Sequence, residues 1–99
     1  MNITEVRQED VIELKVEGRV DTNTSGRLQE AILKALQKSN KIVINCAELE
    51  YVSSAGLRSL LLGHKTASSK GGSMTVINVN DAVNQVFTVT GFSRILKIG

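Results

Sequence analysis

The residues best suited to chemistry form one short segment, in which two adjacent hydroxyls, Ser53 and Ser54, are followed by Ala55 and Gly56. An apolar run precedes the segment and an amphipathic stretch follows it, so both serines are expected at a strand-to-helix junction. The first turn of a helix offers unpaired backbone amides and the positive end of the helix dipole. A phosphate on Ser54 would add about −1.5 to −2 charges, and we expect this position to tolerate it while the exposed surface changes.

A simpler interpretation of the two serines is structural. Serine before a helix usually acts as an N-cap, whose side-chain oxygen accepts a backbone amide and contributes about 1 kcal/mol. Ser53 as the cap and Ser54 as a modified residue are compatible, so both interpretations remain open from the sequence.

No other residue predicts a catalytic or metal site. His64 is the only histidine, and no Cys, Asp or Glu stands around it at metal-ligand spacing, so we expect a half-buried helix residue. Cys46 ends an apolar run and is expected to be an inert core thiol. Gly71-Gly72 lacks the Lys-Ser/Thr of a phosphate loop. We therefore expect neither a cofactor nor enzymatic activity.

The remaining sequence predicts the elements that position the serines. Residues 12–16 alternate apolar and polar side chains, which indicates a half-buried strand that Gly18 should end, and residues 3–6 should form a hairpin with it. Apolar spacings of three and four predict three helices, and β-branched runs predict further strands at 42–44, 74–79 and 95–98. The order β-β-α-β-α-β-α-β implies an α/β fold with a mixed, largely parallel sheet of four to five strands and three or more helices.

Length and composition limit the function classes. A chain of 99 residues suits one domain over 1–99, and 41% hydrophobic with 22% charged residues is typical of a globular protein. A net charge of +2 without a basic stripe argues against nucleic-acid binding. No apolar run reaches the roughly 20 residues that span a bilayer, and the first ten residues lack a signal-peptide core. We therefore expect a cytoplasmic protein without direct membrane insertion.

Three segments together resemble STAS domains of the anti-sigma factor antagonist type. Ser54-Ala55-Gly56-Leu57 resembles the signature in which the family carries its phosphorylated serine. Residues 18–21, Gly-Arg-Val-Asp, resemble a turn after the second strand, and residues 45–49 resemble the end of the next strand. The predicted element order matches the family over nearly the whole chain.

Two positions differ from the family pattern. Ser53 stands where many members have Asp, and Ala55 stands where many have Ser or Thr. The missing carboxylate makes Ser53 a second candidate acceptor beside Ser54.

The resemblance implies a bacterial phosphoprotein that takes part in partner switching. Its partner would be an anti-sigma factor that is also a serine kinase with a GHKL-type ATPase fold. Phosphorylation of Ser54 would weaken that complex, and a metal-dependent serine phosphatase would reverse it. The sigma factor released in this way would make the protein a regulator of transcription.

The expected partner-binding residues surround the serine turn. They are Asp21, Ser53, Ser54, Gly56, Leu57 and Arg58. Core packing of Leu57 and a turn carboxylate at Asp21 are equally acceptable interpretations. One alternative function is a STAS subunit of a lipid-transport or other membrane-associated complex that is not phosphorylated. A small enzyme or nucleotide-binding protein is the other, although the sequence holds no paired catalytic groups for it.

Overall fold

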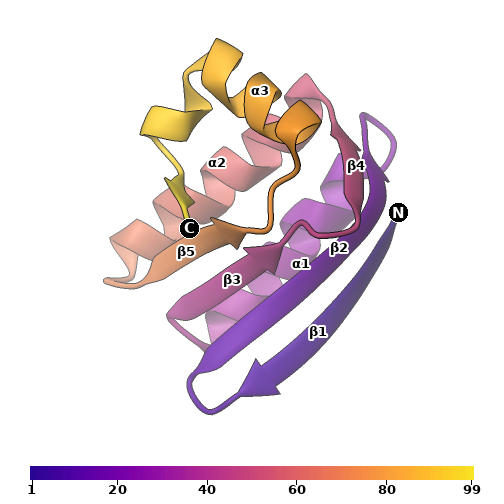
Figure 1. Cartoon of the computed structure of the whole chain (residues 1–99). Helices are drawn as coiled ribbons and strands as arrows, with labels where there is room; N and C mark the ends of the chain where they lie inside the picture. Colours follow the sequence, from indigo (N-terminus) through magenta and orange to yellow (C-terminus); the bar gives the residue numbers. More distant parts are fainter.

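The computed structural model describes residues 1–99 and contains one six-stranded sheet, with α1 and α2 packed side by side on one face. Figure 1 shows these two helices behind the sheet, and the face turned to the viewer carries no helix. The elements are β1 (Asn2–Gln8), β2 (Val11–Val20), α1 (Ser25–Lys38), β3 (Lys41–Asn45), β4 (Leu49–Val52), α2 (Ser54–Ser69), β5 (Ser73–Ile77), α3 (Asp81–Thr90), a 3-10 turn (Phe92–Arg94) and β6 (Lys97–Ile98). The predicted α/β fold is confirmed, with β4 as an additional strand.

The strand order is β1-β2-β3-β5-β6, and β4 pairs with β2 outside this path. Only the β1–β2 hairpin is antiparallel, and the other four pairings are parallel. Parallel strands need crossover connections, which α1, α2 and α3 supply. All carboxyl ends of the parallel strands therefore lie at the same edge of the sheet.

Strand β2 does not end at Gly18, so that prediction is wrong. Gly18 adopts φ +89°, a left-handed conformation that favours glycine, and the register shifts between Gly18 and Arg19. Residues 11–15 of β2 pair with β3 and residues 18–20 pair with β4, and the shift lies within the second pairing, where Glu50 of β4 has no register partner. Strand β2 thus pairs with two parallel neighbours in succession along its length.

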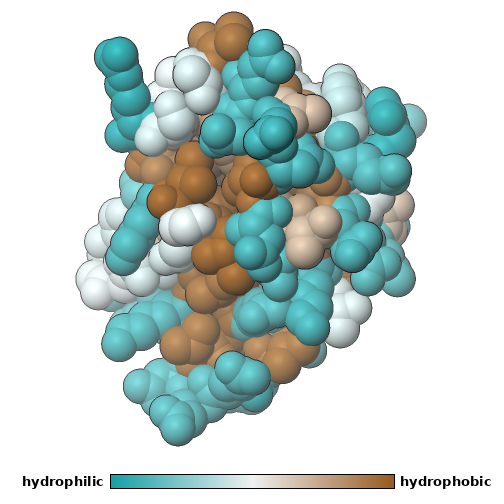
Figure 2. Space-filling view, in the orientation of Figure 1, coloured by the Kyte–Doolittle hydropathy of each residue, from teal (hydrophilic) through white to brown (hydrophobic).

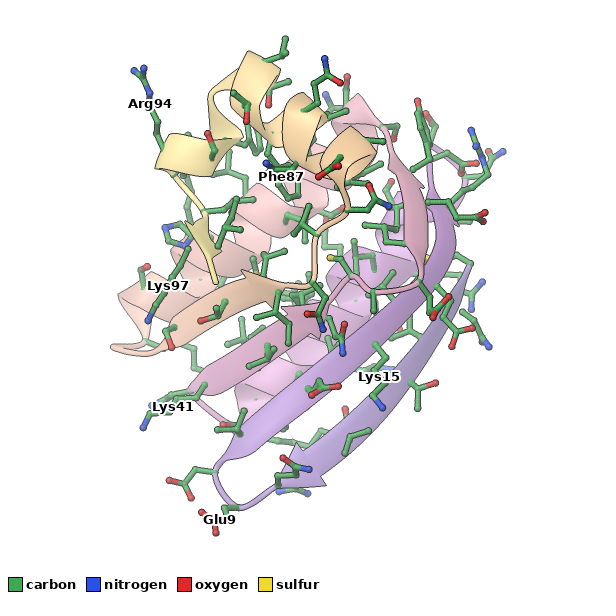
Figure 3. All side chains as sticks on the ribbon, in the orientation of Figure 1. Glu9, Lys15, Lys41, Phe87, Arg94 and Lys97 are labelled. Atoms are coloured by element: carbon green, nitrogen blue, oxygen red, sulfur yellow. The ribbon has the colours of Figure 1, made fainter.

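The core lies between the sheet and the helices. In β2 the side chains of Ile12, Leu14 and Val16 point to the helices and are at most 1% exposed. In α1 the buried residues recur at the helical spacing that the sequence predicts. Phe87 is the one aromatic side chain among the buried core residues, and it points inward from α3 in Figure 3.

The other face of the sheet is open to solvent. Figure 2 shows brown apolar atoms on this face, bordered by teal polar side chains. A shallow hollow near the β1–β2 hairpin is lined there by the apolar residues Val6, Val11, Val43 and Ile77.

Candidate functional site

Two strand ends meet at the serine turn. Val20 of β2 and Val52 of β4 are register partners, and the backbone amide of Ser53 donates to the Val20 carbonyl at 2.8 Å. Asp21 follows Val20 directly, so the structure brings Asp21 and the serines together at the carboxyl edge of the sheet. The sheet topology alone therefore brings together residues of two separate sequence segments.

Ser53 is the N-cap of α2. It has extended backbone angles, and its Oγ accepts the amide of Gly56 at 3.2 Å. The Ser53 carbonyl accepts the amide of Leu57 at 2.9 Å, which closes the first turn. The hydroxyl oxygen of Ser53 is thus engaged in capping α2.

Ser54 is the first residue of α2 and is exposed. Its hydroxyl takes part in none of the side-chain hydrogen bonds within the chain, and it lines none of the five surface hollows. The first turn of α2 holds no acidic residue. A free hydroxyl on an open surface beside a positive helix end is accessible to another macromolecule and suited to carry an anion.

Gly56 and Leu57 lie in the interior of the isolated chain, where neither presents a side chain to the surface. A Cβ on Gly56 would lie 2.7 Å from Val52 Cγ2 and 2.8 Å from Val20 Cγ1. The close approach that this glycine permits is therefore between α2 and the strand ends. Leu57 is 4% exposed and packs in the core, which is the alternative that the sequence left open.

Asp21 is half-buried and organises the turn before α1. Its Oδ1 accepts the amides of Asn23 at 2.9 Å and Thr24 at 3.1 Å, and Thr24 Oγ1 accepts the amide of Asp21 at 2.9 Å. Partial desolvation raises the pKa of Asp21, but the hydrogen bonds from Thr24 and Asn23 and the charge of Arg19 together hold the pKa below its ordinary value. The carboxylate is therefore a turn residue that also stays ionised beside the serines.

Sequence reasoning missed a pair next to this turn. The guanidinium of Arg19 lies 4.3 Å from the ring centroid of Tyr51, and Tyr51 is 39% exposed. The two residues are register partners on β2 and β4, so the pair could be found only once β4 was known. Arg and Tyr are residue types that often dominate binding interfaces.

Arg58 is exposed, one helical turn beyond Ser54. Residues at i and i+4 of a helix are neighbours on its surface, with Cβ atoms about 5–6 Å apart. The cation therefore stands beside the free hydroxyl without any ion-pair partner of its own.

Nothing else in the chain competes as a reactive centre. Burial raises the pKa of the Cys46 thiol to about 12, so this cysteine stays protonated. His, Cys, Asp and Glu form no cluster of three that could hold a metal ion.

A family model described as "Mlab, STAS domain" matches residues 3–97 of the chain. Among curated proteins, an anti-sigma F factor antagonist of Paenibacillus polymyxa is 29% identical over 89% of this chain and 77% of its own length. An anti-sigma-B factor antagonist of Staphylococcus epidermidis is 23% identical over 99% of this chain and 92% of its own length.

Solved structures show the same fold. The crystal structure of an anti-sigma factor antagonist from Mycobacterium paratuberculosis superposes with a TM-score of 0.88 at 20% identity, over 98% of this chain and 83% of that one. The match includes all the elements that position the serine turn.

Proposed function

The chain belongs to the STAS domain family, and from this membership we propose that it is an anti-sigma factor antagonist. In this proposal it binds an anti-sigma factor that is also a serine kinase with a GHKL-type ATPase fold. The names of the similar curated proteins support the proposal, because the similarity to them extends over nearly the whole chain.

The observation that carries the proposal is the free hydroxyl of Ser54. Because Ser53 supplies the N-cap, a phosphate on Ser54 leaves the cap of α2 intact. The engaged oxygen of Ser53 favours Ser54 as the acceptor over its neighbour. The modification would then change the surface without unfolding the helix.

The switch follows from electrostatics. In the unmodified state, the partner closes over a small neutral hydroxyl and the sigma factor is free. After phosphorylation the same interface must accommodate a dianion, at the expense of desolvation and like-charge repulsion. A cost of about 3 kcal/mol weakens binding more than a hundredfold. A metal-dependent serine phosphatase restores the first state.

The test uses the full chain with each anti-sigma serine kinase encoded in its source genome, ATP and Mg²⁺. We expect the mass of one phosphoryl group to be added at Ser54, Ser54→Ala to bind the kinase constitutively and Ser54→Asp to bind poorly. Ser53→Ala is the matched control and should still be phosphorylated. Phosphate found elsewhere, or equal affinities of the two Ser54 variants, would contradict the proposal.

A second candidate function is a STAS subunit of a lipid-transport or other membrane-associated complex. The replacements at Ser53 and Ala55 favour it, because a subunit that is never phosphorylated needs no acceptor motif. None of the helices has the length and hydropathy required to cross a membrane. Stable co-purification with a transport ATPase, together with unmodified Ser54 in the native host, would favour this candidate.

A further inference from the structure

One face of α2 points away from the sheet and carries an unusual combination of side chains. Ser54, Arg58, Leu62 and Lys65 are exposed and follow one another at spacings of four, four and three residues. Such spacing places them on one side of the helix. We call these four residues the outer face of α2.

Leu62 does not contribute to the core as its neighbours do. It is 37% exposed, whereas Leu57 and Leu60 on the inner side of the helix are 4% and 1% exposed. Because the inner side already fills the space against the sheet and α1, the apolar surface of Leu62 remains available to another molecule.

The outer face carries two cations and no anion. Helix α2 contains Arg58 and Lys65 but no Asp or Glu, and neither cation takes part in an ion pair. In α1, by contrast, Lys34 is paired with Glu30 at 2.9 Å and Lys38 with Glu5 at 2.8 Å. The positive end of the α2 dipole adds to the same sign of charge.

We propose that the outer face of α2 selects the partner, and that the contacting surface of the anti-sigma factor is acidic around an apolar hollow that receives Leu62. Charge complementarity and continuity with Ser54 support this occupant. The inference rests on the proposed function, because the partner is the anti-sigma factor that reaches Ser54.

Phosphorylation then acts on this recognition in two ways. A phosphate on Ser54 lies within reach of Arg58, one helical turn away, and their charge-assisted hydrogen bonds occupy the cation. The same phosphate repels the acidic surface of the partner. The first effect neutralises the positive charge that the partner recognises and the second adds repulsion, so the complex dissociates.

The test measures the dissociation constant, by titration calorimetry, between the full unmodified chain and the anti-sigma factor that phosphorylates it. We expect Arg58→Glu to weaken binding more than tenfold and Leu62→Ser about tenfold. Raising the salt concentration should weaken binding of the wild-type chain more than binding of Arg58→Glu. Thermal unfolding checks that each variant folds.

Two matched substitutions control for charge and for apolar exposure. Arg7→Glu reverses an exposed charge on β1, and Val89→Ser removes an exposed apolar side chain, 79% exposed, from α3. Both should bind like the wild-type chain.

The inference is overturned if the wild-type chain binds and is phosphorylated while Arg58→Glu and Leu62→Ser bind equally well. It is also overturned if light scattering shows a dimer that Leu62→Ser dissociates, or if the chain floats with phosphatidylglycerol vesicles and Arg58→Glu does not. If no anti-sigma factor binds or phosphorylates the wild-type chain, the proposed function fails first and the inference fails with it.

Discussion

Helices α2 and α3 begin in the same way but end up with different surfaces. In each, the side chain of the residue before the helix accepts the amide three residues later: Ser53 from Gly56 at 3.2 Å, and Asn80 from Val83 at 2.8 Å. The first helical residue is the neutral Ser54 in α2 and the acidic Asp81 in α3. The caps are equivalent, and the charges that follow them are not.

This difference shows at which helix start the chain itself supplies a charge that opposes the helix dipole. In α3, Asp81 opposes the positive end of the helix dipole, and Asn80 Nδ2 also donates to the Leu49 carbonyl at 2.8 Å. In α2 the cap is satisfied, but the dipole and the Ser54 hydroxyl have no partner. The start of α3 therefore ties the helix to β4, whereas the start of α2 is able to accept a negative charge, such as a phosphate, that the chain itself does not supply.

The largest effect is expected where α2 approaches the sheet most closely. Gly56→Ala places a Cβ under 3 Å from Val20 and Val52, so it should lower the free energy of unfolding by about 1–3 kcal/mol. Gly26→Ala in α1 is the control, because no atom lies within 4 Å of its added Cβ, and it should raise stability by up to about 1 kcal/mol. Urea unfolding measures both, and equal effects of the two substitutions would refute the packing argument.

A smaller effect separates the two caps. Asn80→Ala loses the cap and the bond to the Leu49 carbonyl, which together should cost about 2 kcal/mol. Ser53→Ala loses the cap alone and should cost about 1 kcal/mol. The same urea series compares them, and an equal loss would mean that Asn80 does not tie α3 to β4.

Exchanging the first helical residues tests the dipole argument directly. Ser54→Asp should raise the free energy of unfolding by about 0.3–1 kcal/mol, and Asp81→Ser should lower it by a similar amount. Both changes should shrink in about 1 M salt, which screens exposed charges. An outcome of the same sign for both substitutions would argue against the dipole as the cause.

The smallest effect concerns pH and the Asp21 turn. The pKa of Asp21 is lower in the folded than in the unfolded chain, so its stabilising contribution is present above the ordinary value of 3.8. That contribution is lost as the pH falls through the lower folded pKa. Below pH 4, Asp21→Asn should therefore lose less stability on acidification than the wild-type chain. Parallel acid titrations followed by circular dichroism would show this, and identical profiles would contradict it.

Much of this fold could be predicted from the sequence, because period-two and period-3.6 patterns reflect which side of an element is buried. The strand over residues 12–16 and the helix ending at Gly91, which has φ 82°, are examples. The position of Ser54 at the start of α2 was also predictable, since small polar residues between an apolar run and an amphipathic helix indicate a cap.

Strand β4 was not predictable in this way. It has four residues, and its two central side chains, Glu50 and Tyr51, are both exposed, so it lacks the alternation that marks a strand. Its existence depends on pairing with residues 18–20 of β2, a tertiary contact that no local pattern encodes. The pair of Arg19 and Tyr51 and the interior position of Gly56 were missed for the same reason.

The pairing of β4 with the end of β2 has a consequence for how the serine turn responds to motion. Ser53 is tied to Val20 by a backbone hydrogen bond, and Asp21 is the next residue of the same chain segment. The spacing between Asp21 and the serine turn is therefore fixed by a strand tip and not by the packing of helices. Asp21 also accepts the amides of Asn23 and Thr24 before α1, so the start of α1 is anchored to the same strand tip as the serine turn, and a partner would meet the two as one unit.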